Sequence, residues 1–239
     1  MNHKYEFHVH TIASKDSILT YPFILLLCKL KRIDGLAITD HNEIKNAIKY
    51  KKKLKKHNID VVVGEEILTN KGEIIGLFLK EKIEPNMSPE ETIEKIKSQN
   101  GIVYVPHPFD EKRYKTVLKE EVIKDNKDRI DFIEIHNGRN IENEYSLKQE
   151  AIQIKYGINP IIGSDAHTFF ELGRNVIYTK KNVTKDNIVE EIKNAIFVKK
   201  DCIRISHTFT KIVKLLKMVL GGNWSEIHRI INRKFKKNM

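Results

Sequence analysis

The stretch Lys4-Tyr5-Glu6-Phe7-His8-Val9-His10 sets the pattern from which the rest of the chain is interpreted. It predicts a β-strand over residues 4–8 that ends at two imidazoles. In an extended strand, residues two apart point to the same face, so His8 and His10 can both reach one ion while Val9 turns away. One such pair is weak evidence alone, because a histidine at a strand end is more often a hydrogen-bonded core or surface group.

Four further stretches place imidazole or carboxylate groups just after an apolar run. They are Asp40-His41, Gly64-Glu65-Glu66, Pro106-His107-Pro108 and Asp165-Ala166-His167. Both groups hold borderline divalent metals, and sites in parallel α/β folds form at the carboxyl edge of the sheet. The recurrence predicts a multinuclear metal site in which motifs distant in sequence converge.

The order of apolar patterns favours an α/β fold, because short β-rich runs alternate with longer helical patterns. Strands are expected over 4–8, 35–38, 59–63, 73–79, 102–105, 130–135 and 160–162, and helices over 22–31, 43–57, 88–100 and 142–156. The turn Asn70-Lys71-Gly72 favours an antiparallel pair. The charged residues 109–129 indicate a loop with a short helix.

One domain boundary is expected, after Ile205. It divides a barrel over 1–205 from a basic amphipathic helical tail over 206–239. A first tail helix is expected from His207 to Gly221-Gly222, and a second over 225–237. Such helices suit a membrane-surface or nucleic-acid arm, and equally a cover for the barrel's side or a subunit contact.

Composition narrows the class of protein. The net charge of +11, from 43 Lys and Arg against 32 Asp and Glu, would attract phosphates, nucleic acids or anionic lipid without choosing among them. Two cysteines without a CxxC pair indicate neither a disulfide framework nor a cysteine zinc site, so metal binding must use N and O ligands. No signal-type region or membrane-length apolar run is found, and a cytoplasmic location is expected.

Taken together, the motifs resemble the PHP superfamily of metal-dependent phosphoesterases, named for its polymerase and histidinol phosphatase members. The matching text is His8-Val9-His10-Thr11 with Ser14 and Asp16, Ile38-Thr39-Asp40-His41, Gly64-Glu65-Glu66, Pro106-His107-Pro108, Ile133-Glu134 with Asn137, and Gly163-Ser164-Asp165-Ala166-His167. Its order and rough spacing agree over residues 4–180. The resemblance implies a distorted (β/α)7 TIM-like barrel, here with a C-terminal helical extension, and two or three metals at its mouth.

The resemblance also implies roles for individual residues. His8, His10, Glu66 and Asp165 would surround one ion, Glu66 would bridge to a second ion held by His107, and Asp16, His41 and His167 would hold a third. The implied catalytic set is His8, His10, Glu66, Asp165 and His167. The family motif is Gly-x-Glu, which selects Glu66 over Glu65. Asp40 is interpreted as orienting a ligand or as a structural turn residue.

Glu73 departs from the family pattern. Many members have a histidine at this position, and a carboxylate there would favour Mn or Fe over Zn, unless Glu73 is a solvent-facing strand residue. His136 is a second ambiguous ligand, beside the Asn137 that matches the motif. Arg139 and Arg174 follow the site motifs and could grip phosphate or lie at the surface.

The sequence therefore predicts a hydrolase acting on phosphoric ester bonds. Two or three Mn, Fe or Zn ions would activate water to cleave a phosphate mono- or diester without a Ser or Cys nucleophile. A phosphorylated small molecule is the expected substrate. Two alternatives remain open, which are a nuclease that grips DNA or RNA through the basic tail, and a non-catalytic regulatory module with a structural metal site. The substrate and the oligomeric state are not specified by the sequence.

Overall fold

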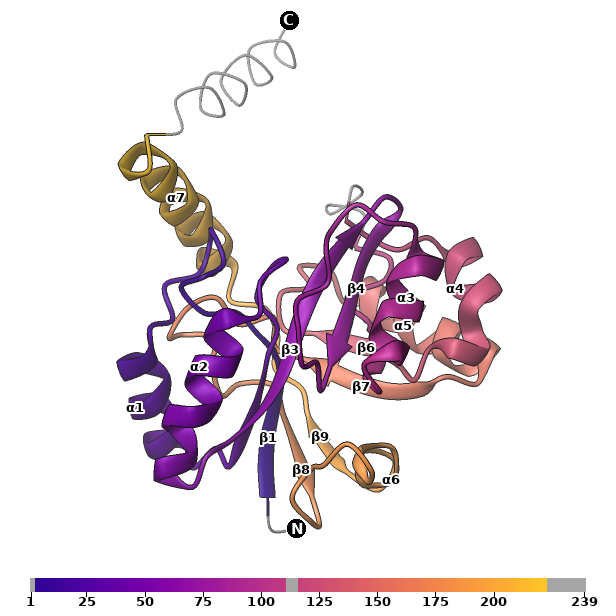
Figure 1. The fold of residues 1–239 in the computed structure, drawn as a ribbon, viewed down its shortest axis with the longest axis horizontal. Helices are drawn as coiled ribbons and strands as arrows, with labels where there is room; N and C mark the ends of the chain where they lie inside the picture. The colour runs from indigo at the N-terminus through magenta and orange to yellow at the C-terminus, as the bar shows by residue number, and fades with distance from the viewer. Residues whose placement is uncertain (1–2, 111–115, 223–239) are drawn as a thin grey trace, which may run out of the picture.

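The computed structural model describes residues 3–110 and 116–222. Within them, nine strands form one sheet in the order β7-β6-β5-β4-β3-β2-β1-β8-β9 (Figure 1). The strands are β1 His3–Val9, β2 Gly35–Ile38, β3 Asp60–Thr69, β4 Gly72–Leu77, β5 Ile102–Val105, β6 Phe132–Asn137, β7 Asn159–Gly163, β8 Val176–Thr179 and β9 Ile196–Val198. The helices are α1 Tyr21–Lys31, α2 Lys45–Leu54, α3 Pro89–Ser98, α4 Glu120–Asn126, α5 Asn143–Tyr156, α6 Ile188–Lys193 and α7 Arg204–Leu220.

The sheet is mixed, with four parallel and four antiparallel strand pairs, and not mainly parallel as the alternating pattern predicts. Strands β1 to β3 pair in parallel, as do β5 to β7, and β4 runs antiparallel between β3 and β5. The predicted antiparallel pair is therefore confirmed. Strand β3 is longer than expected, because after Val63 it leaves β2 and continues to Thr69 as a partner of β4. Glu65 and Glu66 consequently lie within a strand and not after its end.

Strand β1 changes partner halfway along, and this change nearly closes the sheet into a barrel. Its first residues pair with β8, and its register with β2 shifts between Glu6 and Val9. Beyond the shift, β1 bonds to the segment after β7, where Ser164 N donates to Phe7 O at 2.9 Å and Ala166 N to His8 O at 3.2 Å. The carboxyl ends of β1 and β7 therefore meet, although they are separated by most of the chain.

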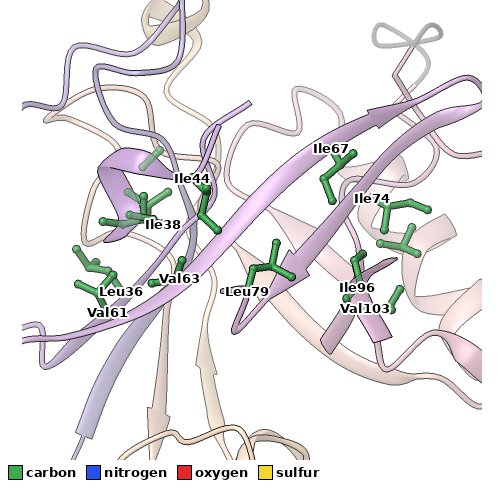
Figure 2. Close-up of a cluster of buried hydrophobic side chains, with 14 of the residues drawn as sticks. Leu36, Ile38, Ile44, Val61, Val63, Ile67, Ile74, Leu79, Ile96 and Val103 are labelled. Carbon is green, nitrogen blue, oxygen red and sulfur yellow. The ribbon is translucent and has the colours of Figure 1, made fainter. Parts of the chain in front are cut away.

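Apolar side chains fill two layers, as the period of two in a strand requires. Leu36, Ile38, Val61 and Val63 join helix residues outside the sheet in one cluster (Figure 2), while the intervening Ala37 and Val62 join Tyr5, Phe7 and Tyr104 in the other. Helices α1 and α2 lie on one side of the barrel, and α3, α4 and α5 on the other (Figure 1). The α/β barrel-like architecture is confirmed.

Local signals explain several helix boundaries. Ser88 and Glu91 form a reciprocal capping box at the start of α3, with Pro89 in the first turn. In α2, Ala47, Tyr50 and Leu54 are buried while Lys51 to Lys53 face solvent, so this lysine run is a solvated helix face. Helix α4 is the short helix expected in 109–129.

Helix α7 projects from the barrel and ends before Gly221 (Figure 1). It begins three residues earlier than the expected start at His207. The second tail helix, predicted over 225–237, lies outside the described residues. Among the helices of 3–110 and 116–222, none is long and apolar enough to cross a membrane.

Candidate metal centre

Nine of the ten predicted ligands come together at one edge of the sheet. They are His8, His10, Asp16, His41, Glu66, Glu73, His107, Asp165 and His167, and they come from the ends of β1, β2, β5 and β7, from the loop before α1 and from the β3–β4 hairpin. Overlapping groups of three, with ligand atoms within 4.8 Å of one another, join eight of these nine residues. Asp16 meets the cluster through two of its histidines.

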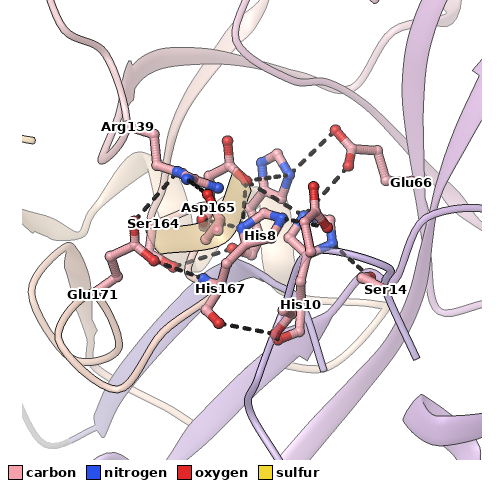
Figure 3. A network of polar contacts seen from close by, with 12 residues as sticks. His8, His10, Ser14, Glu66, Arg139, Ser164, Asp165, His167 and Glu171 are labelled. Carbon is pink, nitrogen blue, oxygen red and sulfur yellow. Dashed lines mark hydrogen bonds and ion pairs between the residues drawn. The ribbon is translucent and has the colours of Figure 1, made fainter. Parts of the chain in front are cut away.

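The first set is formed by His8, His10, Glu66 and Asp165 (Figure 3). The Nε2 atoms of His8 and His10 each lie 3.3 Å from a different oxygen of Glu66. The same two nitrogens lie 3.8 and 3.4 Å from Oδ1 of Asp165. These are the four residues assigned to one ion by the resemblance.

The hairpin residues extend the cluster on the Glu66 side. Nε2 of His107 lies 2.9 Å from Oε1 of Glu66 and 3.6 Å from Oε2 of Glu73. The other Glu73 oxygen lies 3.9 Å from Nδ1 of His41. Glu73 is buried and is not a solvent-facing strand residue.

Asp16, His41 and His167 form the third set. Oδ1 of Asp16 lies 3.3 Å from Nε2 of His167 and 3.7 Å from Nε2 of His41. Nδ1 of His41 lies 2.8 Å from Oε2 of Glu66. Glu66 therefore contacts histidines of all three sets.

The inward atoms fit a metal ion better than a protein hydrogen bond. Nε2 of His8, His10 and His167 and Oδ1 of Asp16 are buried with no hydrogen-bond partner among the described residues, and orphaned buried polar atoms are costly. Two ligands each about 2.1 Å from one ion stand roughly 3.0 to 3.4 Å apart. The contacts of His8 and His10 with Glu66, at 3.3 Å, fall in that range.

Oxygen atoms behind three histidines hold their rings. Nδ1 of His8 lies 2.8 Å from Oε1 of Glu134, and Nδ1 of His10 lies 3.1 Å from Oγ of Ser14. Nδ1 of His167 lies 2.8 Å from the backbone carbonyl oxygen of Asp165. An N–H at Nδ1 satisfies each contact and leaves the lone pair of Nε2 facing the cluster, which is the arrangement of a histidine ligand.

Asp40 takes the orienting role that was one of its two interpretations. Its carboxylate accepts from Thr11 N and Thr11 Oγ1 at 2.6 Å, and from Ser14 Oγ at 2.7 Å. Since Ser14 in turn contacts His10, Asp40 supports a ligand through one intervening side chain.

Three site residues adopt left-handed backbone conformations, with φ of 62° at His8, 29° at His107 and 52° at Asp165. Residues other than glycine rarely adopt positive φ, and such strain concentrates at functional sites. The simple alternation argument for His8 and His10 therefore does not describe their geometry. The two rings reach the same carboxylates because β1 bulges there.

Neighbouring charges shift the pKa values of the cluster. Burial alone would raise the pKa of Glu66, but His8 and His41 hold it well below its usual range. Burial, reinforced by His167 and His41, holds the pKa of His10 well below the usual value. Burial would also lower the pKa of His41, but Glu66 and Asp16 raise it to about 10. An anionic Glu66 and a neutral His10 are the protonation states that metal binding needs.

Comparison with family models settles the relationship. The PHP domain matches residues 6–230. The chain belongs to the PHP domain family. The match confirms the resemblance found in the motifs, and it extends through α7.

Relatives of this PHP domain include an uncharacterised protein of Methanocaldococcus jannaschii, 34% identical over 203 residues, which cover 83% of this chain and 81% of the relative. A two-domain protein from Bacteroides vulgatus, containing a predicted PHP-like metal-dependent phosphoesterase, aligns with a TM-score of 0.64 at 15% identity, over 82% of this chain and 64% of that one. An amidohydrolase from Chromobacterium violaceum, solved with sulfate and without metal, aligns with a TM-score of 0.59 at 14% identity, over 82% and 98%. These two structural matches establish the fold alone.

His136 is not brought to the cluster of the PHP domain. Its Nε2 lies 3.1 Å from Asn175 Oδ1 and its Nδ1 lies 3.3 Å from Ser146 Oγ. The register of β6 with β7 shifts between Glu134 and His136. Simple alternation would place the side chains of Glu134 and His136 on one face of the strand, but this irregularity points them in different directions.

The two predicted phosphate-binding arginines also contact protein groups. Arg139 is buried, donates from Nη2 to Thr210 Oγ1 at 2.7 Å and lies 3.3 Å from Glu171 Oε1. Glu171 also accepts a hydrogen bond from the backbone N of His167 at 2.9 Å (Figure 3). Arg139 therefore holds the carboxylate that positions the His167 backbone. Arg174 donates to the Asp201 carbonyl at 3.1 Å.

A cavity of about 350 Å³ opens beside the third set. It is lined by Ala13, Lys15, Asp16, His41, Asn42, Leu68, Glu73 and Lys214. Lys15 and Lys214 bring positive charge to this lining, which also includes the candidate ligands Asp16, His41 and Glu73. Motif spacing did not identify these lysines, because Lys214 is on α7 and about 200 residues from Lys15.

Proposed function

We propose that this PHP domain is a hydrolase that cleaves a phosphate mono- or diester with metal-activated water. The observation that carries the proposal is the meeting of nine N and O ligand side chains, several with unpaired inward atoms, beside a cavity with two lysines. A regulatory module would need neither the shared carboxylate nor the cavity at its edge.

Two or three bound ions would lower the pKa of water and stabilise the attacking and leaving oxygens. The chain's own part is to hold those ions close together. Glu66 suits this task because its two oxygens contact His8, His10, His41 and His107. Among the described residues that line the cavity, none is Ser, Thr or Cys, which agrees with direct attack by water.

Lys15 and Lys214 are the residues we assign to substrate phosphate, in preference to Arg139 and Arg174. Both lysines line the cavity that Asp16, His41 and Glu73 also line. A phosphate beside the ions would lie within reach of these cations, which neutralise its oxygens as point charges.

The ligand set supports Mn or Fe over Zn. Four carboxylates, from Asp16, Glu66, Glu73 and Asp165, accompany five imidazoles in the cluster. Carboxylate ligands suit harder ions better than imidazole ligands do. Glu73 is the member of this set that departs from the family pattern.

A phosphorylated small molecule is the substrate class that the cavity favours. Its volume of about 350 Å³ falls in the range of small-molecule sites. The alternative of a nuclease drew on the basic tail, whose residues 223–239 lie outside the described part of the chain.

The test uses the purified full chain with its metals assayed. Loaded with Mn or Fe, it should hydrolyse an aryl phosphate monoester or diester, and His8→Ala and Asp165→Ala should each abolish turnover while the circular dichroism spectrum is unchanged. His57→Ala, at an exposed histidine outside the site, is the matched control. Metal-loaded, folded protein that is inactive on both ester classes would overturn the proposal, and cleavage of oligonucleotides alone would favour the nuclease.

A further inference from the structure

Helix α7 turns an apolar stripe to solvent. Ile205, Ile212, Leu215, Leu216, Val219 and Leu220 are each between 40% and 86% exposed. Apolar patches of this kind on a folded chain mark interaction sites. The helix projects beyond the barrel, so the stripe is open to a partner (Figure 1).

The stripe has the spacing of a helix–helix seam. Ile205, Phe209, Ile212, Leu216 and Val219 follow one another at intervals of four, three, four and three residues. This 3.5-residue period keeps one narrow line of side chains facing a second helix, and each side chain then enters a hole between residues of the partner.

The opposite face of α7 fixes the helix on the barrel. Thr210, Val213 and Met218 are buried, and the Lys217 amine donates to the carbonyl oxygens of Ile12, Ser14 and Ser17 at 3.0, 2.8 and 2.7 Å. These contacts already hold the helix in place before any partner binds. Its pairing would cost little ordering entropy.

The charges on α7 favour a second copy over a lipid surface. Of the four Lys and Arg residues of α7, Lys214 lines the cavity and the Lys217 amine is engaged by carbonyls, which leaves Arg204 and Lys211 to face lipid headgroups. Of the positions beside the seam, Ser206 and Val213 are buried, and the exposed Thr208, Leu215 and Leu220 carry no charge. Two copies of this seam could meet without bringing like charges together.

We infer that α7 pairs with α7 of a second copy of this chain, in a two-fold contact along the 205–219 seam. The 17-residue helix is about 25 Å long. A symmetric dimer is also the commonest closed assembly. The inference does not depend on the proposed reaction.

Sedimentation equilibrium of the full chain tests the pairing. The wild type should have twice the chain mass of 28.0 kDa at micromolar concentrations. The double variant Ile212→Glu with Leu216→Glu should dissociate at least about 30-fold more readily, because paired seams would bury unpartnered carboxylates. Ile154→Glu, at a 75% exposed position on α5, is the control that should leave the mass unchanged.

A milder variant, Leu216→Lys, guards against misfolding, and circular dichroism should show unchanged helix content in all variants. A wild type that is monomeric up to about 100 µM would overturn the inference. So would a folded double variant that remains dimeric. Binding of a monomeric wild type to vesicles of phosphatidylcholine and phosphatidylglycerol, lost in the double variant Ile212→Glu with Leu216→Glu but not in Ile154→Glu, would assign the stripe to lipid instead.

Discussion

Glu134 holds His8 from behind, with its Oε1 2.8 Å from Nδ1 of the ring. The same carboxylate accepts from the backbone N of His107 at 2.6 Å and from Asn137 Nδ2 at 2.9 Å. One buried side chain thus positions residues at the ends of two strands. In Glu134→Gln, the amide can donate to Nδ1 and move the ring proton to Nε2, which removes the metal-facing lone pair.

We expect Glu134→Gln to weaken metal binding about 10- to 100-fold, the usual cost of losing such a support. Calorimetric metal titration measures this change. Glu65→Gln is the matched control, because Glu65 Oε2 accepts from Ile83 N at 2.9 Å and takes no part in the cluster. Equal affinities for the wild type and Glu134→Gln would show that the Glu134 contact does not set the ring's tautomer.

Gly163 makes room for Glu134. A Cβ at position 163 would overlap the Glu134 carboxylate and stand 2.8 Å from the Tyr104 hydroxyl. We expect Gly163→Ala to lower the free energy of unfolding by about 1 to 3 kcal/mol and to weaken metal binding. Urea denaturation measures the first effect.

Adding Glu134→Asp to Gly163→Ala shortens the colliding side chain, so part of the lost stability should return. The double-mutant cycle would then show a coupling of at least about 0.5 kcal/mol. Strictly additive losses would mean that the two residues do not collide.

The sequence predicts most of the candidate metal ligands, but not the backbone conformations and side-chain contacts that position them. His8, His10, His107 and Asp165 are recognisable because each follows an apolar run, and parallel strands bring such ends together. The left-handed backbone at His8, His107 and Asp165 leaves only a weak signal in residue type, because His and Asp adopt positive φ more often than most residues but far less often than glycine. Side-chain period alone could not show that β6 loses its regular register before His136.

Hydrogen bonds between residues far apart in the sequence also could not be predicted. Lys217 contacts carbonyls about 200 residues away, and a lysine on a basic amphipathic helix looks the same whether it faces solvent or a loop. Glu134 was visible in a motif, but its contacts with His8 and His107 depend on how three strands are placed.

Lys217 ties α7 to the loop that carries Asp16, through the carbonyls of Ile12, Ser14 and Ser17. Removing the amine leaves three carbonyls without this donor and frees the loop. We expect Lys217→Ala to lower the free energy of unfolding by about 1 to 3 kcal/mol and to reduce kcat/KM about tenfold. Lys211→Ala, at an exposed lysine on the same helix, should change neither quantity, and a similar loss in both variants would point to helix charge alone.

Metal affinity should rise with pH. In the metal-free chain, burial lowers the pKa of His41, but Glu66 and Asp16 outweigh it and raise that pKa to about 10. Below pH 10 the ring therefore carries a proton that a metal must displace, so affinity gains about tenfold per pH unit for each displaced proton. Calorimetry at pH 7 and pH 8, in buffers of different ionisation enthalpy, counts the protons released. Binding without proton release would contradict the high pKa.

Glu73 should decide which metal the site prefers. Its oxygens lie 3.6 Å from His107 Nε2 and 3.9 Å from His41 Nδ1, so an imidazole at position 73 would add a nitrogen to the ligand set and remove one negative charge. We expect Glu73→His to shift occupancy from Mn or Fe toward Zn by about tenfold, since imidazole suits Zn better than carboxylate does.

The measurement is the metal content after loading with equal concentrations of Mn, Fe and Zn under anaerobic conditions. Glu73→Gln separates charge from ligand type, because it removes the charge without supplying an imidazole. That variant should lose metal of every kind without the gain in Zn. If Glu73→His and Glu73→Gln gave the same metal ratios, charge alone would set the preference, and the departure from the family pattern would not be a metal-selecting feature.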